Sequence, residues 1–227
     1  MNNILKMTFT AAIAALSVTF STASPAVAEE PAHQIAIIAD LNAENPILTN
    51  ERYRQRITDM LVSEVEDVGL RYGDKVILRT AGDASLLSQL DSTWNREIQF
   101  AYRQVEPGDL PQALRSFMAK LADIAPQDRS ELVWAVGQLA GSIDCAANEV
   151  VIFVLSNGLE AGQVIDGKFR MPTFAGQPFA DCGAARVVFL GFGAKVTTGN
   201  PNLVPTAETL VGRVFTSAGF GSVEFKR

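Results

Sequence analysis

The chain has 227 residues, of which 48% are apolar and 19% are charged, and its formal net charge at pH 7 is −6. This length and apolar content supply one full hydrophobic core, which predicts a single domain. The acidic balance excludes a general affinity for nucleic acid or for anionic lipid.

The first 28 residues have the pattern of a secretory signal peptide. Lys6 precedes an apolar stretch over residues 7–20, and Ala26-Val27-Ala28 is a small-residue cleavage site. The apolar stretch is too short for a comfortable membrane span, and no later segment approaches one. We therefore expect a signal peptide over 1–28, a single domain over 29–227, a periplasmic or secreted location and no stable membrane insertion after signal removal.

Strand and helix patterns alternate in the first half of the domain. An apolar run predicts a strand over 34–40, and apolar positions at helical spacing predict a helix over 50–68 that ends at Gly69. A second strand is predicted over 75–80. Residues 98–105 alternate more loosely, as an edge strand does.

The second half continues the alternation. Asp109 opens a helix, with its side chain placed to cap the free amides and with Pro111 in the first turn. Ser130 opens a further helix, and Thr206 caps the last one. Strands are predicted over 149–155, 186–192 and 222–225. Strands separated by helices predict an α/β fold with a three-layer, doubly wound, mostly parallel sheet and one antiparallel edge strand.

Two predicted strands end in polar residues. Asp40 ends the first strand, with Asn42 and Glu44 at alternate positions after it, and the strand over 149–155 breaks on Ser156-Asn157-Gly158. Because the carboxyl ends of neighbouring parallel strands share one edge of a sheet, these endings predict a single polar crevice.

The order of these pieces resembles a von Willebrand factor type A domain over nearly all of the chain after residue 28. The matching segments are residues 35–44, 108–114, 151–160 and 187–193. They correspond to the first strand with its Asp-x-Ser-x-Ser loop, the second loop and helix, the strand that ends in Ser/Thr-Asp-Gly, and the strand that ends in Gly-x-Gly. In that family these loops converge on a divalent ion, usually magnesium, whose open position takes a carboxylate from a partner protein.

The resemblance places the family's ligand positions on Asp40, Asn42 and Glu44, on Gly108 or Asp109, and on Asn157. The family has Asp, Ser and Ser in the first loop, Thr in the second and Asp in the third, so the resemblance implies a degenerate metal-ion-dependent adhesion site. Hard oxygen ligands of the kind that Mg²⁺ prefers are offered by Asp40, Asn42, Glu44 and Asp109. We expect no cofactor, or a weakly held Mg²⁺.

The same residues also have purely structural explanations. Asp40 can simply end its strand, and Asn42 can close an Asx turn with the following backbone. Asp109 suits a helix cap, and Asn157-Gly158 suits a tight turn. An exposed loop residue such as Glu44 is commonly a solvated charge.

Cys145 and Cys182 are the two cysteines of the chain. In the oxidising compartment that the signal implies they predict a disulfide, and a pair of free buried thiols is the alternative. Each lies four residues before a predicted strand, over 149–155 and 186–192. If these strands are neighbours, the bridge lies at the amino edge of the sheet, opposite the crevice.

The segment over 163–180 lacks the crossover helix that a type A domain would place there. It is interrupted by glycine and proline and carries Phe169, Met171, Phe174 and Phe179. These apolar side chains either cover the bare face of the sheet or form a docking surface beside the crevice. Part of the segment could serve each purpose.

Catalytic patterns are missing from the sequence. The single histidine, His33, lies at the start of the domain, so Ser-His-Asp and Cys-His arrangements have no base in the core and histidine-based zinc sites are excluded. We therefore predict a non-enzymatic, protein-binding module of adhesion or scaffold type, whose partner is another envelope or extracellular protein. The predicted contact residues are Asp40, Asn42, Glu44, Asp109, Asn157, Phe169 and Phe174. The alternatives are a carboxylate-based or metal-assisted hydrolase on the same edge and a small-molecule-binding periplasmic protein.

Overall fold

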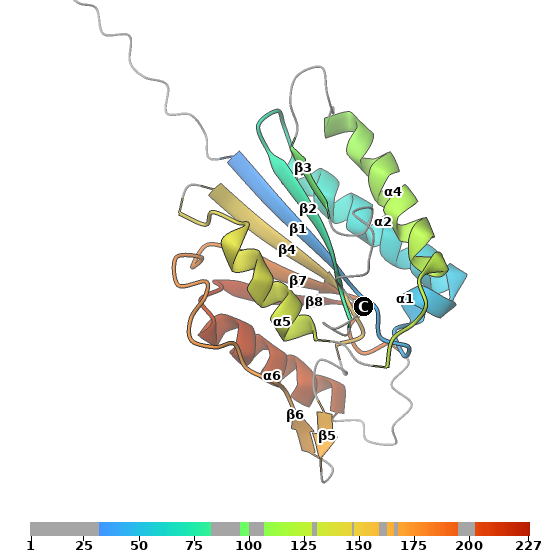
Figure 1. The fold of residues 1–227 in the computed structure, drawn as a ribbon, viewed down its shortest axis with the longest axis vertical. Coiled ribbons are helices and arrows are strands. Elements are labelled where there is room, and N and C mark those ends of the chain that lie inside the picture. The colour runs from blue at the N-terminus through green and yellow to red at the C-terminus, as the bar shows by residue number, and fades with distance from the viewer. Residues whose placement is uncertain are drawn as a thin grey trace, which may run out of the picture. The chain divides into compact units, whose positions relative to one another are not determined.

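The computed structural model describes residues 32–82, 96–99, 107–128, 131–146, 148–158, 163–165, 168–194 and 203–227. All of them belong to one compact unit, Pro31–Arg227. Its six-stranded sheet has the order β3-β2-β1-β4-β7-β8 (Figure 1). The strands are β1 (Ala32–Asp40), β2 (Lys75–Ala81), β3 (Arg96–Gln99), β4 (Asn148–Leu155), β7 (Arg186–Leu190) and β8 (Ser222–Lys226). Five strands are parallel, and β3 runs antiparallel to β2 at one edge.

The central strands are buried on both faces, as continuous apolar runs require. On β1, Ile35 and Ile37 belong to one hydrophobic cluster, whereas Ala36 and Ile38 belong to another. Because alternate side chains of a strand point to opposite faces, the two clusters lie on opposite sides of the sheet.

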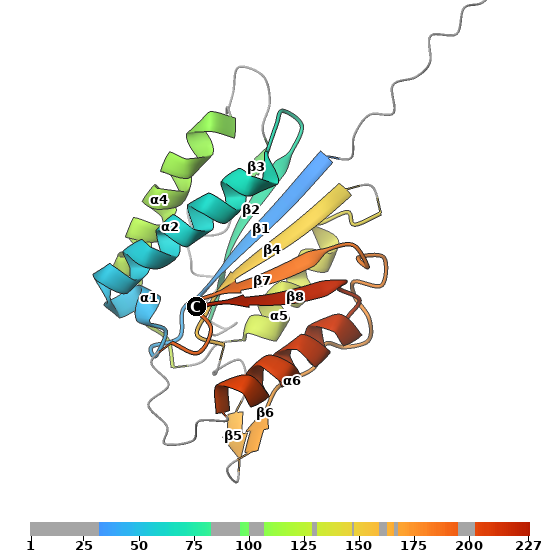
Figure 2. The ribbon, with the colours of Figure 1, turned by 180° about the vertical axis from the view of Figure 1, so that it is seen from behind.

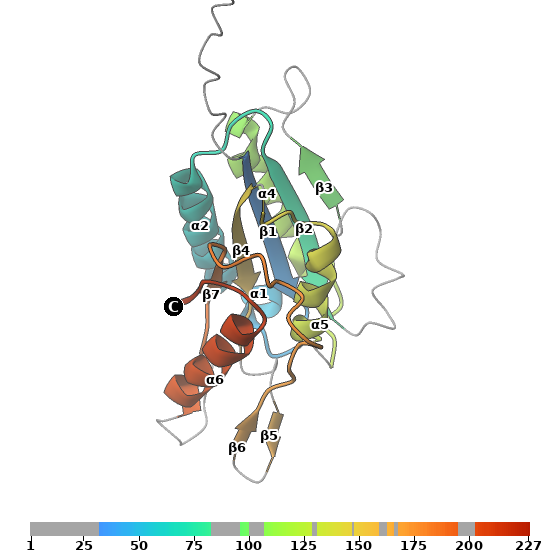
Figure 3. The same ribbon diagram turned by 90° about the vertical axis from the view of Figure 1, so that its left-hand side faces the viewer.

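Helices cover both of these faces. The helices α1 (Pro46–Thr49), α2 (Glu51–Val68) and α4 (Leu110–Lys120) lie on one side (Figure 2), and α5 (Leu132–Gly137) and α6 (Leu203–Ser217) on the other. Figure 3 views the sheet from its side and shows α2 and α5 on opposite sides of it. Short 3₁₀ turns extend two of these helices: η1 (Pro107–Asp109) and η2 (Leu121–Asp123) lie at the two ends of α4, and η3 (Gln138–Gly141) follows α5. Among the described residues, no helix is both long enough and apolar enough to cross a membrane.

Helix α2 has the boundaries that its sequence predicts. The Asn50 side chain accepts a hydrogen bond from the Tyr53 N–H at 3.0 Å, which caps the start of the helix. Gly69 ends it in the left-handed conformation, with φ +70°. Glycine suits this position because a Cβ would crowd the following carbonyl oxygen.

Two predicted helix caps are wrong. The helix α6 begins at Leu203, so Thr206 lies within its first turn, where Pro205 also fits because the first amides of a helix have no internal partner. Asp109 does precede α4, but its side chain makes no capping hydrogen bond. The turn η1 already gives Asp109 helical angles, φ −83° and ψ −14°, instead of the extended backbone of a capping residue. Ser130 lies outside the described residues.

The predicted disulfide between Cys145 and Cys182 is confirmed. The two residues precede β4 and β7, which are neighbours in the sheet. The backbone N–H of Asp144 donates to the Gln34 side chain near the start of β1. The bridge therefore lies at the amino edge of the sheet, where the sequence places it.

The segment between β4 and β7 contains no helix among its described residues. It forms a small antiparallel hairpin, β5 (Gln163–Ile165) and β6 (Lys168–Arg170), followed by an irregular stretch over 171–178. Phe179 is buried, and Phe174 packs edge-on against Phe179 and against Phe215 of α6. These rings cover the α6 side of the sheet, which confirms the covering role for Phe179 and, in part, for Phe174.

Candidate functional site at the carboxyl edge

The polar endings of β1 and β4 lie side by side. Ala39 is the register partner of Leu155, so Asp40 and Ser156 follow as neighbours. The Ser156 hydroxyl donates a hydrogen bond of 2.6 Å to Asp40 Oδ2. The polar endings of β1 and β4 therefore form one shared rim at the carboxyl edge of the sheet, as the sequence predicts.

The loop after β1 is built from two successive Asx turns. Asp40 Oδ1 accepts the backbone N–H of Asn42 at 3.0 Å, and Asn42 Oδ1 accepts the backbone N–H of Glu44 at 2.9 Å. Such short side chains fold back onto the backbone two residues later. The structural explanation holds for Asp40 and Asn42, which are both buried, whereas Glu44 is exposed.

Asn45 is a buried connecting residue that the sequence analysis missed. Its Nδ2 donates to the Asp40 carbonyl at 2.8 Å and to the Leu155 carbonyl at 3.1 Å. Its Oδ1 accepts the Ile47 N–H and so caps α1. The signal in the sequence is the pair Asn45-Pro46, a cap residue followed by a proline at the first helical position.

Asn157 joins the ends of three strands. Its side chain donates to the Glu44 carbonyl at 3.4 Å, and its own carbonyl accepts the Gly193 N–H at 2.8 Å. Gly158 follows with φ +72°, and a Cβ there would lie only 1.9 Å from the Phe192 ring. The tight turn at Asn157-Gly158 thus fixes the loops after β1, β4 and β7 against one another.

Gln127 also reaches this edge, which no strand ending in the sequence indicates. It forms a parallel bridge with Asn42, its carbonyl accepts the Ala43 N–H at 2.8 Å, and its N–H donates to the Leu41 carbonyl at 2.9 Å. It lies in the irregular stretch between η2 and α5. Neither strand periodicity nor helix periodicity marks such a stretch as part of a site.

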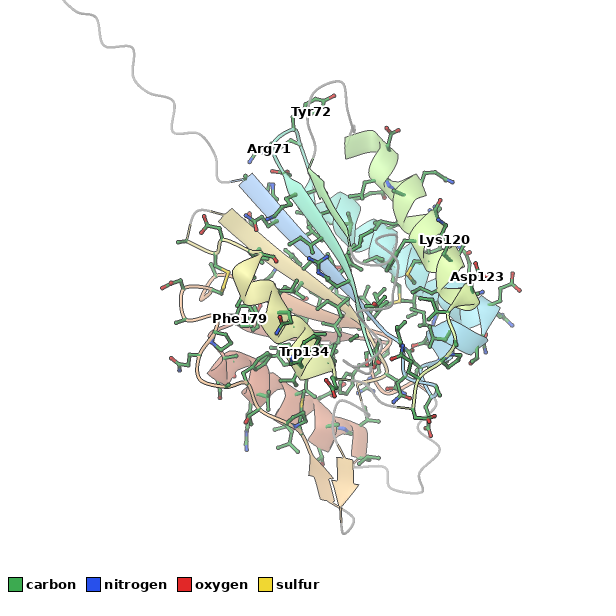
Figure 4. The ribbon with its side chains drawn as sticks, in the orientation of Figure 1. Arg71, Tyr72, Lys120, Asp123, Trp134 and Phe179 are labelled. Carbon is green, nitrogen blue, oxygen red and sulfur yellow. A yellow bond between two sulfur atoms is a disulfide. The ribbon has the colours of Figure 1, made fainter. Side chains whose placement is uncertain are left out.

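Asp109 does not lie at this edge, and its predicted place there is wrong. The end of β3 at Gln99 pairs with Lys75, at the start of β2, so the chain has returned to the amino edge before α4 begins. Helix α4 then runs toward the carboxyl edge, where η2 contacts α1. Figure 4 places Lys120 and Asp123 at this end of the molecule. Asp109 is exposed at the other end of a helix of 11 residues, about 16 Å long at 1.5 Å per residue.

The four residues predicted to hold Mg²⁺ therefore do not fit such an ion. Asp40 is fully buried and accepts hydrogen bonds on both carboxylate oxygens, while Asn42 Oδ1 is used by the Glu44 N–H. Asp109 is too far away to complete the set. Within the part of the chain that the structure describes, no cluster of three His, Cys, Asp or Glu side chains could hold a metal ion.

Tyr53 of α2 packs beneath the loop after β7. Its hydroxyl donates to the Gly191 carbonyl at 3.0 Å, and a Cβ at Gly191 would lie 2.1 Å from that hydroxyl. Burial raises the pKa of the Tyr53 phenol, and the Arg56 guanidinium above its ring opposes this effect. The phenol therefore stays neutral and keeps its hydrogen bond at physiological pH.

A groove of about 560 Å³ opens between α5 and the stretch over 171–178. It reaches the carboxyl edge because Glu131, one of its lining residues, donates its backbone N–H to the carbonyl of Gly82, directly after β2. The predicted contact residue Phe174 is half-buried and lines this groove. The side chain of Phe169, another predicted contact residue, lies outside the described part of the chain.

The fold and this edge together define an α/β domain with a mainly parallel sheet, flanking helices and polar loops gathered at the carboxyl ends of the strands. No family model matches the chain, and no curated protein matches it. Among solved structures, two of the pilus adhesin SpaC from Lactobacillus rhamnosus GG are similar, each at 10% identity, with TM-scores of 0.49 and 0.50. They cover 87% and 86% of this chain, which spans 28% of the length of the adhesin. Proximal thread matrix protein 1 from the mussel byssus is similar at 11% identity with a TM-score of 0.38, over 80% of this chain and 48% of its own. The adhesin structure with the TM-score of 0.50 is only 10% identical to this chain, so the two are similar in fold alone.

Proposed function

We propose that this chain is a protein-binding module of adhesion or scaffold type, which contacts an envelope or extracellular protein at the carboxyl edge of its sheet. We further infer a type A-like, three-layer, doubly wound arrangement, in which the crossover between β4 and β7 is irregular. The functional proposal rests on the structural role of the polar side chains at this edge. Asp40, Asn42 and Asn157 hold the loops together, and they leave Ala43 and Glu44 exposed on a fixed backbone.

A loop fixed in this way is suited to recognition. Ordering a mobile loop on binding costs free energy, and a loop that is already held by hydrogen bonds avoids most of that cost. In this proposal Glu44 and Phe174 contact the partner. The buried residues Asp40, Asn42 and Asn157 position the contact surface from beneath.

Two further observations support an extracellular setting. Cys145 and Cys182 form a disulfide, and disulfides persist in oxidising compartments but are rare in the cytosol. The similar structures include a pilus adhesin, and the shared fold is compatible with an adhesive role here.

The hydrolase alternative is less well supported by the geometry. Its best-placed carboxylate, that of Asp40, is fully buried and already accepts hydrogen bonds from Ser156 and Asn42, so it has no path to a substrate.

A small-molecule receptor is the second candidate, because the groove beside α5 has a volume within the usual range of ligand sites, roughly 300–1,000 Å³.

Site-specific photocrosslinking tests the proposed edge. A photoreactive phenylalanine analogue replaces Glu44 in one variant and Tyr72 in a control, since Tyr72 is exposed near the start of β2, at the amino edge (Figure 4). Both variants are irradiated with the envelope fraction of the source cells. We expect a discrete adduct from position 44 and none from position 72. Equal adducts from both positions, or none from position 44, would contradict a contact at the carboxyl edge.

A further inference from the structure

Trp134 exposes a large apolar side chain to solvent, and packing of its helix against the sheet does not require this exposure. It is 45% exposed, and among the described residues the other large exposed apolar side chain is Tyr72. Its neighbours Leu132, Val133 and Val136 are buried. Because residues three and four apart share a helix face, Glu131 and Gln138 flank Trp134 along the exposed side of this helical segment.

The opposite wall of the groove is held rigidly in place. Phe174 lies in its middle, and its ring centroid is 5.9 Å from that of Phe179 and 5.3 Å from that of Phe215. The Phe179 N–H donates to the Ala218 carbonyl at 3.0 Å, which ties the end of the wall to α6. A groove with one wall on a helix and the other on this anchored stretch is already formed before a ligand arrives.

The lining of the groove limits what can bind there. It is mainly apolar, with contributions from Val133, Trp134, Pro172, Phe174, Ala175 and Pro178. Among the described lining residues, the charged one is Glu131, so a cation complements it. The wall over 171–178 is not a strand and offers no ladder for a partner strand. An extended polyproline-type segment needs no such ladder, and it docks on aromatic-lined grooves.

We propose that this groove binds a proline-rich, extended segment of the protein partner, with a lysine or arginine of that segment beside Glu131. This inference rests on the proposed protein-binding function and names the chemistry of its partner. Trp134 supplies the flat apolar surface on which proline rings pack, and Pro172 and Pro178 close the far side. Glu131 fixes the direction of the segment, since a basic residue at only one of its ends can reach the carboxylate.

Peptide titrations of the full chain test this proposal. The probe is a short polyproline peptide with one terminal arginine, compared with the same peptide ending in glutamate and with a glycine-serine peptide of equal length. Binding is followed by the indole N–H signal of Trp134 in a ¹⁵N–¹H spectrum, assigned by its loss in Trp134→Phe. We expect the arginine peptide to shift this signal and the glycine-serine peptide to leave it unchanged.

Variants identify the groups responsible. Trp134→Ala should weaken binding of the arginine peptide by about tenfold or more, as loss of a central aromatic contact does. Glu131→Gln should weaken the arginine peptide by about two- to fivefold, in line with a solvent-accessible ion pair, and should not weaken the glutamate peptide. Tyr72→Ala removes an exposed aromatic ring elsewhere and should change neither.

The opposite results overturn the proposal. Peptides that leave the Trp134 signal unchanged at millimolar concentration, or that bind Trp134→Ala equally well, exclude this groove as a proline-rich site. A dimer in sedimentation equilibrium that Trp134→Ala abolishes would assign the groove to a second copy of the chain instead. If position 44 still yields its partner adduct while the peptide fails, the proposed function stands and only the chemistry assigned to the groove is wrong.

Discussion

Asp40 connects the ends of β1 and β4 through one buried carboxylate. Its two oxygens accept hydrogen bonds from the Asn42 N–H and from the Ser156 hydroxyl. Removing the carboxylate leaves two buried donors without these acceptors, and each such loss costs about 1–3 kcal/mol. We therefore expect Asp40→Ala to lower the free energy of unfolding by roughly 2–6 kcal/mol in urea denaturation.

Asp59→Ala is the matched control for this variant. The Asp59 carboxylate is more than half exposed and pairs with Arg115 on the surface, so its loss should cost less than about 1 kcal/mol. If the two variants unfold at the same urea concentration, the carboxylate of Asp40 does not hold the rim together.

Substitutions at Gly158 and Gly176 distinguish the free-energy cost of backbone strain from that of steric overlap, because both residues have φ +72°. At Gly176 nothing lies within 4 Å of an added Cβ, so Gly176→Ala should cost only the left-handed backbone penalty of about 1–2 kcal/mol. At Gly158 the added carbon would overlap the Phe192 ring, and displacing that ring should cost a further ~1–3 kcal/mol. Equal losses in thermal or urea unfolding would show that Phe192 moves freely.

Tyr53 makes the stability of the folded chain depend on pH in the alkaline range. Because burial raises the pKa of the phenol in the folded chain above its ordinary value of 10.0, the neutral phenol favours folding. This contribution is complete below pH 10 and is lost as the pH rises through the folded-state pKa. Unfolding free energies measured from pH 8 upward should therefore fall more steeply above pH 10 in the parent than in Tyr53→Phe.

The same variant has an effect at neutral pH. Tyr53→Phe loses the hydrogen bond to the Gly191 carbonyl, which should cost about 0.5–1.5 kcal/mol. An identical pH profile for the parent and Tyr53→Phe would show that the phenol is not desolvated.

At the scale of the elements, periodicity explains which ones the sequence could predict. The apolar runs of β1 and β4 and the amphipathic pattern of α2 are set by local burial, so their positions are visible in the sequence. The sequence does not indicate the start of α6, because Thr206 has the side chain of a capping residue, whereas the two residues before Pro205 are already helical. Caps depend on the backbone angles of one residue, which composition does not fix.

The site was only partly predictable for a related reason. The pairing of Asp40 with Asn157 at one edge follows from two parallel strands, whereas Asp109 and Gln127 are placed by topology. Because β3 runs antiparallel to β2, the chain crosses back to the amino edge, which puts Asp109 there and brings Gln127 to the rim after α4. The position of one short strand thus decides which polar residue joins the site.

The stretch over 171–179 replaces a crossover helix by burying single aromatic side chains. Phe179 is 1% exposed and packs against Phe174 and Phe220. Phe179→Ala should lower the free energy of unfolding by about 3–5 kcal/mol, as expected for a buried phenylalanine. Trp134→Ala, which removes a half-exposed ring, should cost far less in the same denaturation experiment. Similar losses would mean that Phe179 does not anchor the groove wall.

At the scale of the whole molecule, covalent stabilisation and the proposed recognition lie at opposite edges of the sheet. The Cys145–Cys182 bridge spans 37 residues of sequence at the amino edge, and closing a loop of this size contributes roughly 3–4 kcal/mol, mainly by restricting the unfolded chain. The double substitution Cys145→Ser and Cys182→Ser should therefore lower the free energy of unfolding by about this amount. Because the rim at the carboxyl edge is held by its own hydrogen bonds, the Glu44-position adduct and the peptide response of Trp134 should persist wherever the variant remains folded. Loss of either response in a sample whose circular dichroism is still native would show that the two edges are coupled, and that the bridge also shapes the recognition surface.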